Sequence, residues 1–345
     1  MPTRRSSTTE PDGRLTLWRS FRVRASLAVA PLLLAGARPG PARPTPAARD
    51  PLVYASNEKG NSVSVISART NVVVATILVG KRPRGLALSP DHATVYVALG
   101  EDNAIGVIDV AQAKLTAAFP ADSDPELLVL SPDGGTVYVS NEQIAKASAI
   151  DRATHRVLFS TPVGAEPEGV GISRDGSKVY ITSETASTVS VLDAKTGTVR
   201  GTLKVGDNPR TIAFTPDGGR AWVTAEAGGT VTVLDAARDS ILTQFPIGDR
   251  TTKPVRVAFA PDGRVAYVTE GAGASVRVID AVRHTEIGRI MVGQRPWGIA
   301  VSPDGRWLYT ANGRANTVSV IATDTRTVAH TVAVGERPYD LLYIP

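Results

Sequence analysis

The stretch VGKRPRGLALSPDHATVYVALGEDNAIGVIDVAQAKLTAAFP, residues 79–120, is one copy of a unit that recurs along the chain. Its proline, Pro83, returns at Pro125, Pro167, Pro209, Pro254, Pro296 and Pro338, at intervals of 42 residues except for one interval of 45. Periods of about 20 to 50 residues are typical of supersecondary units that must stack on their neighbours to bury a core. Seven such units predict an all-β fold, a seven-bladed β-propeller.

Each unit contains four segments of strand length. In residues 79–120 they are Gly85–Ser89, Thr94–Ala98, Ala104–Asp109 and Lys114–Pro120, all rich in residues that favour β-strands. The tetrapeptide SPDG, as at Ser131–Gly134, follows the first segment and has the composition of a tight turn. We therefore expect each blade to be a four-stranded antiparallel sheet.

The two ends of the repeat region are complementary. The chain enters at Val53–Ser56, which matches the second strand of a unit, and it finishes at Leu341–Ile344, which matches a first strand. We therefore expect the C-terminal strand to pair with the N-terminal blade and close the ring. Closure removes the unpaired edges that otherwise invite aggregation.

The N-terminal segment has the features of a leader. Six arginines precede an apolar stretch from Ala25 to Ala37, which ends in the small residues Ala35-Gly36-Ala37. This order is typical of a secretory signal peptide, and the apolar stretch is too short to span a bilayer. We predict a signal peptide over residues 1–37, a flexible proline-rich linker over 38–51 and the propeller over 52–345, in a periplasmic or secreted protein.

Composition excludes several classes of function. The leader supplies +4 of the formal net charge of +5, so the pI of about 9.5 does not indicate a nucleic-acid partner. The chain has no cysteine, which excludes disulfides, thiolate metal sites and covalent c-type haem. We expect a monomer with no membrane span.

The loops around the repeat prolines and the loops after the YV pairs should lie at the same end of the propeller, around the channel mouth. Their side chains differ between blades, and such departures from a repeat are where function is expected. The candidate ligand-binding residues are Arg82, Arg84, Glu126, Glu168, Arg210, Arg256, Arg295, Trp297, Arg337 and Tyr339. Converging arginines could receive a carboxylate, with Trp297 and Tyr339 stacking against the ligand. Alternatively, these charges pair with one another and only keep the face soluble.

The sequence offers little for metal or nucleophilic catalysis. The histidines, His92, His155, His284 and His330, fall in turns or an outer strand, and no GxSxG motif occurs. Glu142, Glu184 and Glu226 occupy equivalent loop positions that could offer oxygen ligands to calcium, but equivalent positions are spread around a ring. We expect no metal site and no catalytic residue.

Several segments carry a family resemblance. Tyr138-Val139-Ser140-Asn141 and Tyr309-Thr310-Ala311-Asn312 resemble the YVTN-repeat β-propeller family. VGKRPRGLALSPD (79–91), DPELLVLSPDG (124–134) and VGQRPWGIAVSPDG (292–305) are similar to the propeller proteins associated with catabolism dependent on pyrroloquinoline quinone (PQQ). That resemblance implies a periplasmic protein that works beside a quinoprotein alcohol dehydrogenase or its cytochrome.

These observations lead to one main hypothesis and two alternatives. The main hypothesis is a non-catalytic propeller whose mouth binds a carboxylate-rich ligand, with PQQ as a possible ligand, or a partner protein of a PQQ-linked alcohol oxidation system. One alternative is a lactonase-like hydrolase that uses mouth carboxylates as general bases. The other is a cell-surface adhesion module.

Overall fold

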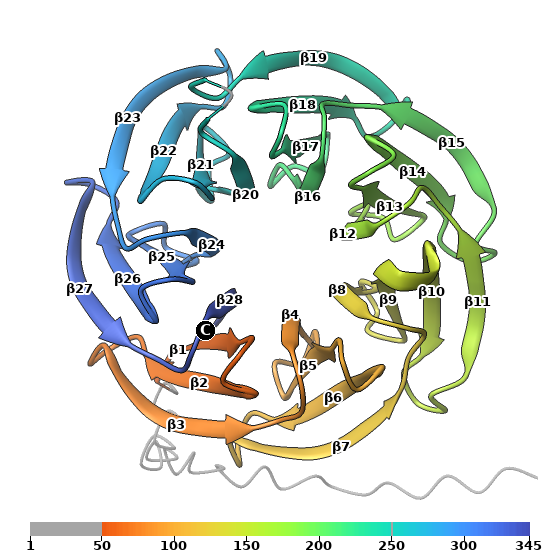
Figure 1. Cartoon of the computed structure of the whole chain (residues 1–345), viewed down its shortest axis with the longest axis horizontal. Helices are drawn as coiled ribbons and strands as arrows, with labels where there is room; N and C mark the ends of the chain where they lie inside the picture. Colours follow the sequence, from red (N-terminus) through yellow and green to blue (C-terminus); the bar gives the residue numbers. More distant parts are fainter. Residues whose placement is uncertain (1–49, 250) are drawn as a thin grey trace, which may run out of the picture. The chain divides into compact units, whose positions relative to one another are not determined.

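The computed structural model describes residues 50–249 and 251–345. These residues form seven four-stranded antiparallel sheets, arranged as a ring around a central channel (Figure 1). The prediction of an all-β, seven-bladed propeller is thereby confirmed. The signal peptide predicted over 1–37, and all but the last two residues of the linker predicted over 38–51, lie outside the described residues.

Each blade runs from an innermost strand beside the channel to an outermost strand on the outer circumference of the ring (Figure 1). Blade 1 consists of β28 (Pro338–Ile344), β1 (Leu52–Asn57), β2 (Ser62–Ser67) and β3 (Val72–Leu78). Blade 2 has β4 (Pro83–Leu88), β5 (Thr94–Leu99), β6 (Ala104–Asp109) and β7 (Lys114–Pro120). Blade 3 has β8 (Pro125–Leu130), β9 (Thr136–Asn141), β10 (Lys146–Asp151) and β11 (Val157–Pro162), with a short 3-10 helix, η1 (Glu142–Ile144), between β9 and β10. Blade 4 has β12 (Pro167–Ile172), β13 (Lys178–Ser183), β14 (Thr188–Asp193) and β15 (Val199–Lys204).

The remaining blades follow the same order. Blade 5 has β16 (Pro209–Phe214), β17 (Arg220–Ala225), β18 (Thr230–Asp235) and β19 (Ser240–Pro246). Blade 6 has β20 (Pro254–Phe259), β21 (Val265–Glu270), β22 (Ser275–Asp280) and β23 (Thr285–Met291). Blade 7 has β24 (Pro296–Val301), β25 (Trp307–Asn312), β26 (Thr317–Ala322) and β27 (Thr327–Ala333). In the part of the chain that the structure describes, no helix has the length and apolar character needed to cross a membrane.

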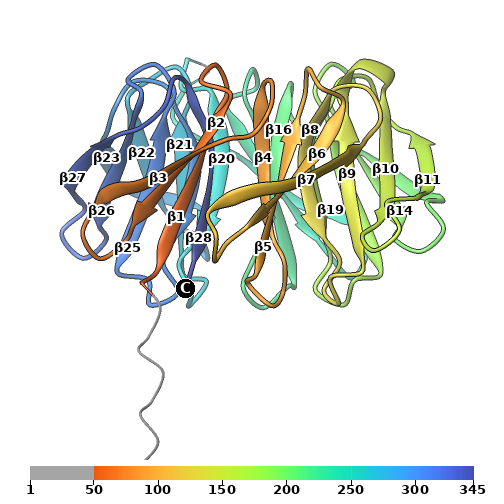
Figure 2. The same ribbon diagram turned by 90° about the horizontal axis from the view of Figure 1, so that it is seen from below.

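The C-terminal strand closes the ring, as expected. β28 pairs antiparallel with β1, with Leu52 opposite Ile344 and Tyr54 opposite Leu342. In the side view, β28 ends at the lower rim of the ring (Figure 2). Its first residue, Pro338, therefore lies toward the other rim, where the proline loops of all seven blades gather.

The SPDG-type turns lie on the face of the ring opposite the proline loops, where each connects the first and second strands of a blade. In blade 4 the Ser173 hydroxyl donates to Asp175 Oδ1 at 2.6 Å and accepts the Lys178 amide at 3.0 Å. Gly176 supplies the left-handed φ of 72° that completes the turn. These hydrogen bonds stabilise the turn, so turn formation alone accounts for the repeated tetrapeptide and no ligand is needed to explain it.

Buried hydroxyl groups tie successive blades together. Five of them donate to a backbone carbonyl on the innermost strand of the next blade: Ser56 to Arg84, Ser140 to Glu168, Thr182 to Arg210, Thr224 to Val255 and Thr269 to Trp297. Each acceptor residue directly follows a repeat proline. The bonds therefore fix the backbone of the residues whose side chains turn toward the channel mouth.

We predict that Thr182→Val lowers the free energy of unfolding by about 1–3 kcal/mol, because it leaves buried polar groups unpaired. The Thr182 hydroxyl donates to the Arg210 carbonyl at 3.0 Å and accepts the Gly169 amide at 2.7 Å. Urea unfolding measures the change. The matched control is Thr76→Val on the exposed face of β3, which should change stability by less than about 0.5 kcal/mol. Equal effects for the two variants would contradict the role of these hydroxyls.

Candidate functional site

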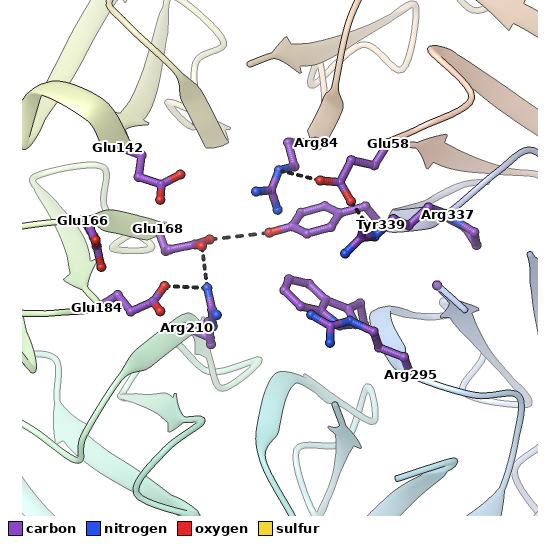
Figure 3. A pocket seen from close by; sticks show the side chains of 13 residues that line it. Glu58, Arg84, Glu142, Glu166, Glu168, Glu184, Arg210, Arg295, Arg337 and Tyr339 are labelled. Atoms are coloured by element: carbon purple, nitrogen blue, oxygen red, sulfur yellow. Dashed lines mark hydrogen bonds and ion pairs between the residues drawn. The ribbon is translucent and has the colours of Figure 1, made fainter. Parts of the chain in front are cut away.

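A cavity of about 320 Å³ opens at the channel mouth. It lies on the rim where the proline loops meet the loops that follow the second strands, so both loop families share one face as predicted. Five glutamates, four arginines and two aromatic residues contribute to its wall (Figure 3). The lining residues are Glu58, Arg84, Glu142, Glu166, Glu168, Glu184, Arg210, Arg295, Trp297, Gly313, Arg337, Pro338 and Tyr339.

Most of the candidate residues from the sequence converge on this cavity. Seven of the ten line it: Arg84, Glu168, Arg210, Arg295, Trp297, Arg337 and Tyr339. The other three, Arg82, Glu126 and Arg256, do not. The sequence therefore located the cavity, but it did not show which side chains reach the surface of that cavity.

Arg256 lines a different cavity, of about 230 Å³, whose walls are mainly aliphatic side chains of the innermost strands. Its Nη1 lies 3.1 Å from Asp340 Oδ1. The two cavities have no lining residue in common. Arg256 faces the second cavity because it is two residues beyond its repeat proline, whereas Arg84, Arg210 and Trp297 directly follow theirs.

Aromatic side chains line the mouth cavity and pack across the channel. The rings of Trp297 and Tyr339 lie 4.8 Å apart, and both belong to a buried cluster with Leu127 and Val255. The Arg84 guanidinium lies over the Tyr339 ring at 4.3 Å. The Tyr339 hydroxyl donates to Glu168 Oε2 at 3.4 Å, and burial raises the pKa of this tyrosine well above its ordinary value. Trp297 and Tyr339 therefore form a well-packed, neutral aromatic surface beside the charged groups of the wall.

Arg82 is held by carboxylates. Its guanidinium pairs with Asp124, with Glu126 Oε1 at 2.7 Å and with Glu142 Oε2 at 3.5 Å. The three carboxylates are close enough to one another to surround a metal ion. The guanidinium of Arg82 already supplies the positive charge that such a cluster requires, so we assign no metal to it.

Arg210 is similarly surrounded. Its Nη1 donates to Glu168 Oε1 and Glu184 Oε2, and its Nε donates to Glu226 Oε2, each at 2.5 Å. One guanidinium therefore pairs with three carboxylates, so this part of the site carries surplus negative charge. A ligand carboxylate would have to compete with all three for Arg210.

Arg295 is in the opposite situation. Among residues 50–249 and 251–345, no carboxylate lies within ion-pair distance of its guanidinium, which instead stacks over Trp297 at 4.8 Å. Burial lowers the pKa of Arg295, and Arg314, Arg337 and Arg210 lower it further against the opposing charge of Glu226. A guanidinium that is partly desolvated and surrounded by like charge gains most from an incoming anion.

Burial shifts the pKa values of the carboxyl groups of blade 3 in the mouth. Glu126 is fully buried, and burial together with the charge of Glu168 raises its pKa well above the usual range. Burial also opposes ionisation of Glu142, but its polar neighbours, the charges of Arg84 and Arg82 among them, outweigh burial and lower the pKa of Glu142. The pKa values of these two neighbouring carboxyl groups are therefore shifted in opposite directions.

Four glutamates line the cavity that we did not select as ligand-binding residues: Glu58, Glu142, Glu166 and Glu184. Glu58 joins three arginines: its Oε2 lies 3.1 Å from Arg337 Nε, and its Oε1 lies 3.7 Å from Arg84 Nε and 3.8 Å from Arg82 Nε. The sequence does contain a signal, because Glu58, Glu142 and Glu184 each directly follow the second strand of a blade. That shared position indicates a common face of the ring.

Residues 67–344 match the model of the Virginiamycin B lyase family. Among solved structures, hydrazine synthase of Kuenenia stuttgartiensis is similar with a TM-score of 0.72 and 25% identity, over 78% of this chain and 92% of that chain. A putative 6-phosphogluconolactonase from Bacteroides fragilis has a TM-score of 0.74 and 18% identity, over 86% and 99%. The periplasmic gluconolactonase of Pseudomonas aeruginosa has a TM-score of 0.71 and 19% identity, again over 86% and 99%. No curated protein matches the chain.

We predict that Glu126→Gln changes how stability depends on pH. A carboxyl group whose pKa is raised on folding stabilises the folded state while it is protonated, and this contribution is lost as the pH rises from the unfolded value of about 4.5 through the folded value. The amide keeps an oxygen that can accept the hydrogen bond from Arg82, and it cannot ionise. The test is urea unfolding at a series of pH values from about 5 to about 9. The free energy of unfolding of the variant should increase relative to that of the wild type by up to about 1.4 kcal/mol per pH unit.

The control for this experiment is Glu101→Gln, at an exposed glutamate in a loop that follows a second strand. Its stability profile should run parallel to that of the wild type. A parallel profile for Glu126→Gln as well would show that Glu126 is already ionised across this range.

Proposed function

The chain belongs to the Virginiamycin B lyase family, and from this premise we propose that its propeller mouth binds a small carboxylate-bearing molecule. The observation that carries the proposal is Arg295, a partly desolvated guanidinium in the cavity wall with no carboxylate partner among the described residues. Trp297 and Tyr339 offer aromatic surface beside it. Bidentate pairing of a guanidinium with a carboxylate, next to an aromatic face, is a common way to hold such a ligand.

We further propose that this binding serves a PQQ-linked oxidation system in the periplasm. The support is the resemblance of the segments at 79–91, 124–134 and 292–305 to the PQQ-associated propellers, together with the leader-like composition of residues 1–37. The partner would be a quinoprotein dehydrogenase or its cytochrome. PQQ carries three carboxylates, and the surplus of glutamates in the wall favours a single carboxylate at Arg295 over the simultaneous capture of all three.

A hydrolase is the second candidate, because not every carboxylate of the mouth is bridged to an arginine. Glu166 accepts a hydrogen bond from the Thr185 hydroxyl and has no ion pair within the described residues, and the ion pair of Glu142 with Arg82 is a long one, at 3.5 Å. A general base and a cation that stabilises developing negative charge would then share one cavity. The fold is shared with the periplasmic gluconolactonase of Pseudomonas aeruginosa and the putative 6-phosphogluconolactonase of Bacteroides fragilis, which motivates a lactone as the substrate to test.

The binding proposal predicts the behaviour of Arg295→Met. Calorimetry should detect binding of benzoate to the purified protein, and the substitution should weaken it by about tenfold or more, because the charge-assisted hydrogen bonds are lost. Benzamide, which has the same shape and no charge, should bind weakly to both proteins. Arg283→Met, at an exposed arginine that pairs with Asp280, serves as the matched control and should leave benzoate binding intact.

The absence of benzoate binding, or binding that is indifferent to Arg295→Met, would refute the proposal. The same titration with PQQ tests the finer assignment. No heat with PQQ would remove PQQ as a ligand while leaving the carboxylate site in place.

The hydrolase candidate makes a separate prediction. If Glu142 or Glu166 acts as a general base, gluconolactone should be opened faster than in buffer, and Glu142→Gln or Glu166→Gln should reduce the excess rate by about 10²-fold or more. A pH-stat measures the acid released. A rate equal to that in buffer would eliminate this candidate.

A further inference from the structure

The incompletely compensated charges of the mouth cavity lie on two opposing sides of its wall. The remaining charged residues of the lining, Glu58, Arg84 and Arg210, are engaged in ion pairs. The acidic wall comes from blades 3 and 4 and consists of Glu142, Glu166, Glu168 and Glu184. The basic wall comes from blades 7 and 1 and consists of Arg295, Trp297, Arg337 and Tyr339. Figure 3 shows the four glutamates on one side of the cavity and Arg295, Arg337 and Tyr339 on the other.

The acidic wall has more negative charge than its neighbours neutralise. Arg210 is shared by Glu168 and Glu184 and also by Glu226. Glu166 is exposed, and the group that contacts its carboxylate is the neutral hydroxyl of Thr185. Burial raises the pKa of Glu184, against the opposing effect of Arg210. A cationic group placed beside this wall would relieve the repulsion among these carboxylates.

The basic wall has the opposite imbalance. Arg337 pairs with Glu58 at 3.1 Å, but the Arg295 guanidinium has no such partner among the described residues and faces the like charges of Arg314 and Arg337. No ion pair within residues 50–249 and 251–345 joins one wall to the other. The Tyr339 hydroxyl does reach Glu168, but it is neutral. The surplus negative charge of the acidic wall and the surplus positive charge of the basic wall are therefore not paired with each other.

Building on the carboxylate-binding function proposed above, we propose that the natural ligand of the mouth is a zwitterion. Its carboxylate binds Arg295, its ammonium group binds the acidic wall at Glu166 and Glu184, and its apolar stem lies over Trp297. A ligand of this kind compensates both walls at once. A polycarboxylate would place its further negative charges against the glutamates, and a simple amine would leave Arg295 without a partner.

The test compares four linear six-carbon molecules that differ in their end groups: 6-aminohexanoate, hexanoate, adipate and hexylamine. Calorimetry on the purified protein should give 6-aminohexanoate an affinity about tenfold higher than that of hexanoate, a difference of about 1.4 kcal/mol. Adipate should bind more weakly than hexanoate, because its second carboxylate faces the acidic wall. Hexylamine should bind more weakly than 6-aminohexanoate.

Glu166→Gln tests the acidic wall with little risk to folding, because Glu166 is exposed. It should reduce the preference for 6-aminohexanoate over hexanoate by about threefold, as expected for the loss of one solvent-exposed ion pair. The matched control is Glu101→Gln, on a loop that follows a second strand and outside the cavity lining, which should leave the preference unchanged.

The outcomes separate this inference from the function on which it rests. Equal affinities for 6-aminohexanoate and hexanoate, or tighter binding of adipate, would overturn the zwitterion and leave the carboxylate site standing. A preference that Glu166→Gln does not change would also overturn it. The absence of binding by all four molecules would overturn both proposals.

Discussion

The pairing of β28 with β1 is the contact on which the rest of this molecule depends. It joins the last strand of the chain, β28, to the first strand, β1, so that every blade packs between two neighbours. The same strand carries Tyr339, which lines the mouth cavity, and Asp340, which lines the second cavity. Closing the ring and completing both cavities are therefore one event, and neither cavity can exist in a chain whose ring is open.

Contacts between neighbouring blades of the closed ring also determine the backbone positions of the residues that line the mouth. The carbonyl groups of Arg84, Glu168, Arg210 and Trp297 each accept a buried hydroxyl from the preceding blade. These four side chains line the mouth, so their backbone positions are fixed by contacts that lie outside the cavity. Gly169 contributes in the same way, because a Cβ at that position would lie 2.6 Å from the Arg210 carbonyl oxygen. A rigid support of this kind allows like charges to stay close together without the strands moving apart.

The charges of the mouth are unevenly compensated, and this is what distinguishes the face chemically. Arg82 has four carboxylates within ion-pair distance and Arg210 has three, whereas Arg295 has none among the described residues. A surface that served only solubility would be expected to pair its charges locally with its neighbours. Separation of the surplus charges onto opposite blades instead favours a bound molecule that spans them.

The sequence by itself determined the number of blades, the four strands in each blade, the closure of the ring and the face on which the loops gather. Each of these follows from a period of 42 residues and a pattern of short apolar runs. It also placed Arg84, Arg210, Arg295 and Tyr339 on that face, since each stands next to a repeat proline. It could not determine that Arg82 and Glu126 lie outside the lining, or that Arg256 turns into a second cavity. Nor could it determine that, within the described residues, Arg295 is the one candidate arginine of the mouth lining without a carboxylate at ion-pair distance. Only the tertiary structure decided these points, because the pairing of charges depends on distances between blades that are far apart in the chain.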